Sequence, residues 1–93
     1  MTIPPEILAV SEATGVSVSD IMGRSRTVIV SDARRIAAHL MWQRGLTMEV
    51  IGRAFNCTHG AVSFGISRLA ELRSVDPKLD ALVTRLETKK PAR

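Results

Sequence analysis

The sequence predicts an all-α domain of five or six helices. Apolar residues recur at helical spacing in successive segments of the 93-residue chain. Ser, Thr, Gly and Pro separate these segments at positions that are typical of helix ends. Aromatic residues make up only 3% of the chain, so the core must consist of Leu, Ile, Val, Met and Ala, a mixture that suits packed helices.

The end signals place each helix in turn. The first is expected to start at Pro4 or Pro5 and to end before Gly15. The ranges expected for the others are 18–22, 32–44, 48–55, 58–74 and a last helix from 76 or 77. N-caps are expected from Ser17, Ser31, Thr47 and Thr58. The positions expected to face inward are Ile3, Ile7, Val10, Ala13, Ala33, Ile36, Ala37, Leu40, Met41, Val50, Ile51, Phe55, Val62, Ile66, Leu69, Leu72, Leu79, Leu82, Val83 and Leu86.

Arginines gather around the start of the expected 32–44 helix. Arg24 and Arg26 fall in 23–30, which is predicted to be an ordered loop because its β-branched residues have no hairpin partner. Arg34 and Arg35 are expected in the first helical turn, where cations oppose the macrodipole by about 0.3–1 kcal/mol each. A nearby phosphate would reverse that penalty, so both arginines are candidate phosphate contacts. The alternative is that they split, with one directed toward DNA and the other toward solvent or an acidic neighbour. The ordinary alternative for Arg24 and Arg26 is a solvated loop charge.

A helix, a short turn and a longer helix follow one another between Thr47 and Leu72. This order is typical of a helix-turn-helix, whose second helix places its N-terminal residues at the base edges of the major groove. Small or polar side chains occupy these positions here. Together with Thr47, the candidate DNA contacts are Thr58, His59, Gly60 and Ser63. The alternatives left open are an exposed helix-start residue for His59 and plain polar surface for Ser63 and Ser67.

Four other residues call for a structural interpretation. Gly52 lies in the middle of an expected helix, where glycine costs about 1 kcal/mol relative to alanine, so another helix is expected to cross there closely. His39 is expected to be a solvated surface residue, and Trp42 to be half-buried. Cys57 and His59 fall short of the three or four ligands that zinc needs, so Cys57 is interpreted as a plain turn thiol.

Composition bounds the remaining function classes. The net charge of +4 favours a polyanionic partner. A single cysteine excludes an intrachain disulfide and fits a reducing cytosol. The sequence shows neither a signal peptide nor an apolar run of the ~20 residues that a bilayer span needs. We expect a cytoplasmic, nucleoid-associated binder of double-stranded DNA, with no membrane or small-molecule partner, no cofactor, no metal and no enzymatic site.

Five short motifs, taken in order, resemble a known family. They are Val18-Ser19-Asp20-Ile21-Met22, Arg24-Ser25-Arg26, Arg34-Arg35-Ile36-Ala37-Ala38, Ile51-Gly52-Arg53-Ala54-Phe55 and His59-Gly60-Ala61-Val62. With them, residues 3 to about 72 resemble the C-terminal DNA-binding domain, domain IV, of the bacterial replication initiator DnaA. The resemblance implies a domain IV-like bundle that contains a helix-turn-helix and binds duplex DNA.

The resemblance also implies roles for individual residues. Arg24 would contact the minor groove, Arg26 the backbone, Arg34 a phosphate and His59 the bases. The family usually reads Arg-Asp-His-Thr-Thr-Val at the turn, whereas this chain has Cys57-Thr58-His59-Gly60-Ala61-Val62. The resemblance therefore does not predict recognition of the family's usual DNA site.

The family's nucleotide-binding motor has no counterpart in this sequence, which lacks a Gly-rich phosphate loop. We expect a helix-turn-helix domain over 1–88 and a basic tail or linker over 89–93, as a stand-alone binder or the N-terminal module of a longer protein. A longer chain would allow RNA polymerase or replication proteins as further partners.

Three functions stay open. Separation from the motor favours a transcriptional regulator, with a replication-control module that binds origin sites as the alternative. A protein–protein adaptor is the third, with a partner face formed by Leu79, Leu82, Val83 and Leu86.

Overall fold

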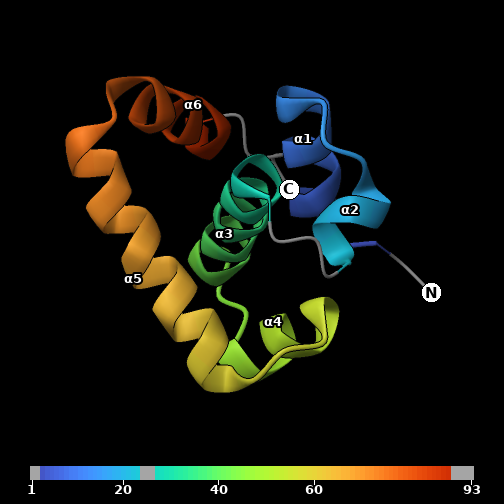
Figure 1. Ribbon diagram of the computed structural model, residues 1–93. Coiled ribbons are helices and arrows are strands. Elements are labelled where there is room, and N and C mark those ends of the chain that lie inside the picture. Colours follow the sequence, from blue (N-terminus) through green and yellow to red (C-terminus); the bar gives the residue numbers. More distant parts are fainter. Residues whose placement is uncertain (1–2, 24–26, 89–93) are drawn as a thin grey trace.

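Six helices make up the part of the chain that the structure, a computed structural model, describes: residues 3–23 and 27–88 (Figure 1). They are α1 (Pro5–Thr14), α2 (Val18–Met22), α3 (Val28–Gln43), α4 (Met48–Phe55), α5 (His59–Val75) and α6 (Pro77–Thr88). Neither described range contains a strand, which confirms the predicted all-α class. None of these helices is long and apolar enough to cross a membrane. Arg24, Arg26 and the 89–93 tail lie outside the described residues.

Side-chain caps define three of the helix starts. The hydroxyl of Ser17 accepts a hydrogen bond from the Asp20 amide at 3.1 Å, at the start of α2. The Thr47 hydroxyl likewise accepts from the Val50 amide at the start of α4, and the Thr58 hydroxyl accepts from the Ala61 amide at the start of α5. All three caps were predicted and are confirmed.

The start of α3 differs from the prediction. The helix begins at Val28, with Thr27 in the N-cap position, so Ser31 lies inside the helix instead of capping it. Val30 is buried and lies three residues before Ala33, on the same face of the helix. Burial of Val30 against the core therefore explains why β-branched residues extend this helix by a turn, in place of the expected loop.

The core surrounds α3, which contacts each of the other five helices (Figure 1). Most positions expected to face inward are buried or partly buried. Ile3, Ala13 and Val50 are exceptions, because all three are exposed.

The apolar face of α6 packs inward. Leu79, Val83 and Leu86 are buried in the core, and Leu82 packs against it. The face that the adaptor hypothesis assigned to a partner protein is therefore buried within the domain itself. It is not available to bind another protein.

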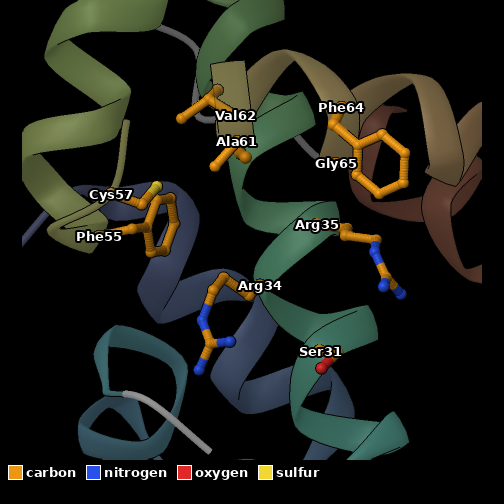
Figure 2. A pocket seen from close by; sticks show the side chains of 10 residues that line it. Ser31, Arg34, Arg35, Phe55, Cys57, Ala61, Val62, Phe64 and Gly65 are labelled. Atoms are coloured by element: carbon orange, nitrogen blue, oxygen red, sulfur yellow. The ribbon is translucent and has the colours of Figure 1, made fainter. Parts of the chain in front are cut away.

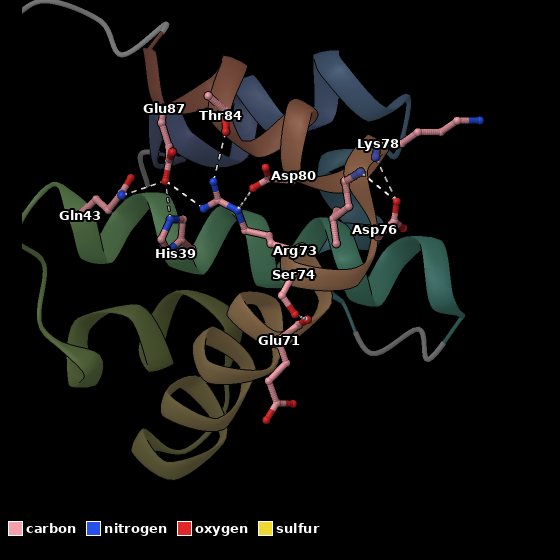
Figure 3. A network of polar contacts seen from close by, with 11 residues as sticks. His39, Gln43, Glu71, Arg73, Ser74, Asp76, Lys78, Asp80, Thr84 and Glu87 are labelled. Carbon is pink, nitrogen blue, oxygen red and sulfur yellow. Dashed lines mark hydrogen bonds and ion pairs between the residues drawn. The ribbon is translucent and has the colours of Figure 1, made fainter.

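A polar network joins α6 to α3 and α5 (Figure 3). Glu87 on α6 accepts hydrogen bonds from Gln43 at 2.9 Å and Arg73 at 3.3 Å, and its Oε2 lies 2.7 Å from His39 Nε2. Arg73 also donates to Asp80 at 2.7 Å. The prediction of a solvated His39 was wrong, because Glu87, its partner 48 residues away, draws it into this network.

A second ion pair fastens the N-terminal helix. Glu6 on α1 is buried and pairs with Arg44, which follows α3. The charge-assisted contact explains how a carboxylate is tolerated in the core, since a buried ion without a partner would be costly.

Candidate nucleic-acid interface

The turn between α4 and α5 is built on a close backbone approach. Asn56 adopts a left-handed conformation with φ of 55°, which asparagine tolerates better than most residues. The Cys57 amide then donates a hydrogen bond to the Gly52 carbonyl at 2.8 Å. A Cβ on Gly52 would lie 2.7 Å from the Cys57 carbonyl oxygen. Gly52 thus makes room for the turn itself, and the predicted helix crossing was wrong.

The start of α5 is open to solvent. Thr58, His59, Gly60 and Ser63 are all exposed, whereas Val62 faces the core. A Cβ at Gly60 would meet no atom within 4 Å. The first turn contains no acidic residue. Its free backbone N–H groups and positive dipole end favour a nearby anion.

A depression lies on the α4 side of this helix start. His59 and Thr58 form part of its lining, together with Glu49, Gly52, Arg53, Asn56 and Cys57. The Nη2 atom of Arg53 lies 3.7 Å from Oε2 of Glu49, and both side chains are well exposed. His59 therefore lies beside a weakly paired surface arginine of α4.

A groove of about 270 Å³ lies on the other flank, between α3 and α5 (Figure 2). Arg34 and Arg35 enter its lining from α3, and Ala61, Phe64 and Gly65 from α5. The structure thus brings both predicted arginines beside the N-terminal half of α5, although neither lies in the first turn of α3. The macrodipole argument for phosphate binding therefore fails.

Arg34 holds the end of α2. Its guanidinium donates to the carbonyl oxygens of Ile21 at 2.8 Å, Gly23 at 2.9 Å and Asp20 at 3.1 Å. Two of these carbonyls belong to the last turn of α2 and the third to its C-cap residue, Gly23, where helical partners run out. Arg34 is therefore a structural tie between α2 and α3, a role that the sequence analysis missed.

Arg35 lines the same groove and is partly exposed. It donates to Asp32 at 2.8 Å, and its side chain is 28% exposed. A Cβ at Gly65 would lie 3.7 Å from Arg35 Cγ, an ordinary contact distance. The stem of Arg35 therefore contacts α5 at Gly65, and its guanidinium, paired with Asp32, lies on this flank of the helix.

Comparison with known proteins identifies the family to which this arrangement of helices belongs. Residues 7–69 match the family described as the bacterial DnaA protein helix-turn-helix. The chain belongs to this family. Its α4, turn and α5 are accordingly the helix-turn-helix of a DnaA-type DNA-binding domain.

One curated relative is the chromosomal replication initiator protein DnaA of Picosynechococcus sp. (strain ATCC 27264 / PCC 7002 / PR-6). The two are 36% identical over 86 residues, which cover 89% of this chain and 19% of the relative. The chain spans about a fifth of that relative's length.

The predicted site residues fall into three groups in this DnaA-type domain. Thr58, His59, Gly60 and Ser63 gather at the start of α5, and Arg34 and Arg35 line the groove beside it. Thr47 is exposed at the start of α4, where its hydroxyl caps the helix.

Phe64 is a surface feature that the sequence analysis missed. Its side chain lies on the second helix of the motif and is 69% exposed. A helical spacing argument could have found it, because Phe64 follows Gly60 by four residues and so shares its face.

Cys57 is the exposed thiol of the turn. Partial burial raises the pKa of this thiol, and the nearby positive charge of Arg34 offsets only part of that effect. The thiol therefore stays protonated at neutral pH, which supports its interpretation as a plain turn residue.

Proposed function

We propose that this domain binds double-stranded DNA sequence-specifically, with the N-terminal half of α5 in the major groove. The observation that carries the proposal is the exposed start of α5, where small and polar side chains surround free backbone N–H groups in a DnaA-type helix-turn-helix. His59 and Ser63 would contact base edges, and Thr58 and Gly60 would allow a close approach to the duplex.

Phosphate contacts would come from the arginines that flank the helix. Arg35 is the best placed among the described residues, because its stem contacts α5 at Gly65 and its side chain is partly exposed. Arg34 would add positive charge while it holds α2, and the family resemblance adds Arg24 and Arg26. A few such contacts predict a log–log salt slope of a few units.

The biological role that we propose is replication control. The relative that matches 89% of this chain is named a chromosomal replication initiator, which favours origin sites over the transcriptional role expected from the sequence. Replication proteins are accordingly the partners to test first in the cell.

The decisive experiment selects bound duplexes from a random pool and then titrates the best site against salt. Specific binding that weakens steeply between about 50 and 200 mM salt is expected. A titration that is flat in salt, or a pool that shows no enrichment, would refute the proposal. Genomic mapping of bound sites then separates the roles, since occupancy at promoters without origins would favour transcription.

A further inference from the structure

Phe64 is an apolar side chain in an unusual place. Its side chain is 69% exposed, although it lies inside α5, in the second turn of the helix. No other large apolar side chain is exposed between residues 59 and 74 of this helix. Single exposed apolar side chains are common on protein surfaces and need no explanation. Phe64 differs because it lies on the second helix of the DNA-binding motif.

The surroundings of Phe64 leave its ring prominent. Small residues occupy the other exposed positions of α5 between residues 60 and 67: Gly60, Ala61, Ser63 and Ser67. One turn after Phe64, the exposed side chain of Arg68 pairs with Glu71 at 3.1 Å. Gly60 lies one helical turn before Phe64 and offers open space, with no atom within 4 Å of a Cβ there. A duplex that approaches α5 closely at Gly60 would therefore meet the side chain of Phe64 one helical turn later.

The groove beside Phe64 favours a polyanion. Its ring and the side chain of Arg35 lie on the same flank of α5 (Figure 2). Arg34 lines the same groove, whose lining contains no acidic residue, although Asp32 next to it pairs with Arg35 at 2.8 Å. Two arginines against one carboxylate leave this flank positive, which favours a nucleic acid over an uncharged partner.

We propose that Phe64 is a specificity-determining residue that contacts the C5-methyl group of a thymine in the major groove. The proposal rests on the DNA-binding function proposed above and deepens it. Thymine is the base that presents an apolar group in the major groove, and phenylalanine is among the side chains that contact it. His59 and Ser63 would supply the polar contacts, and Phe64 the apolar one.

The test uses the full chain and the best duplex selected from a random pool. Each thymine of that duplex is replaced in turn by deoxyuridine, which lacks only the methyl group. The wild-type protein is expected to lose about fourfold in affinity at one thymine or two, the amount that one buried methyl group contributes. Phe64→Ala should bind the parent duplex at least about fourfold more weakly and show no further loss at that thymine.

Val75→Ala is the matched control, because Val75 is 76% exposed at the far end of the same helix. It should keep both the parent affinity and the deoxyuridine effect. Melting temperatures establish that each variant is folded, which is expected for truncation of exposed side chains.

Three results would overturn the inference. They are unchanged affinity of Phe64→Ala for the parent duplex, a deoxyuridine loss that persists in this variant, and a selected site with no thymine sensitive to deoxyuridine. A change in self-association of Phe64→Ala with unaltered DNA affinity would likewise assign the ring to a protein contact. Failure of the wild-type chain to select any duplex would instead refute the proposed function itself, so the two failures are distinguishable.

Discussion

Gly52 and Cys57 meet through their backbones at the centre of the helix-turn-helix. The Cys57 amide donates to the Gly52 carbonyl at 2.8 Å, and the Cys57 carbonyl oxygen occupies the space beside the Gly52 Cα. A side chain at residue 52 would separate the two segments. This contact therefore sets how closely the turn, and with it the start of α5, folds back onto α4.

The first prediction follows from this contact. Gly52→Ala places a Cβ 2.7 Å from a backbone oxygen, so it should lower the free energy of unfolding by about 1–3 kcal/mol, as overpacking does. Gly60→Ala is the control, because its Cβ would meet open space and it should be neutral or stabilising by up to about 1 kcal/mol. Urea denaturation measures both variants. If Gly52→Ala were as stable as Gly60→Ala, the turn would have to adjust its backbone to accommodate the added methyl group.

Local sequence chemistry was sufficient to predict most helix starts. Ser17, Thr47 and Thr58 each bond to an amide three residues along the chain, so their capping depends on no distant partner. The start of α3 at Val28 was not predicted, because the extra turn of this helix depends on the burial of Val30, which is a tertiary effect.

Distant partners explain what the sequence could not predict at the site. Arg34 binds carbonyls that lie 11–14 residues earlier, and sequence spacing cannot reveal that contact. The open start of α5 was predictable, because small and polar residues after a turn are a local pattern. The groove that joins Arg35 to Phe64 required the packing of α3 against α5.

The second prediction concerns the tie between α2 and α3. Arg34→Lys keeps the charge but loses the forked donor geometry, so it should lower the free energy of unfolding by about 1–3 kcal/mol. Arg35→Lys should change it by about 1 kcal/mol or less, because the pair with Asp32 is partly solvated. Denaturation of both variants gives the comparison, and an Arg34→Lys variant as stable as the wild type would remove the structural role assigned to Arg34.

The third prediction is a pH dependence of stability. Burial alone raises the pKa of Glu87, but hydrogen bonds from His39, Arg73 and Gln43 outweigh it and leave the pKa below its usual value. The unfolded chain therefore takes up this proton first as pH falls. The stabilisation is complete above about pH 4.5 and is lost as pH falls through the lowered pKa of the folded state.

Glu87→Gln isolates this effect. The variant should be less stable than the wild type near neutral pH, and the difference should shrink as pH falls below about 5 towards the lowered pKa of Glu87. Thermal unfolding across this range measures it. A difference that stays constant with pH would show that the Glu87 carboxylate does not stabilise the fold by its charge.

The fourth prediction concerns the cap of α5. Thr58→Ala removes the acceptor for the Ala61 amide and should cost about 1 kcal/mol of stability. Thr58→Ser keeps the acceptor and should stay within about 0.5 kcal/mol of the wild type. Both variants are measured by denaturation before their DNA binding is compared. If the serine variant is as unstable as the alanine variant, the hydroxyl cap is not the source of the stability.

The last prediction separates base reading from phosphate contact. His59 is exposed at the start of α5, whereas Arg35 reaches the flank of that helix from α3. Base contacts specify and phosphate contacts position. His59→Ala should therefore cost about 1–3 kcal/mol on the best duplex and much less on random DNA. Arg35→Ala should weaken both about equally and reduce the salt slope by about 1. Identical profiles for the two variants would mean that the start of α5 does not read the bases.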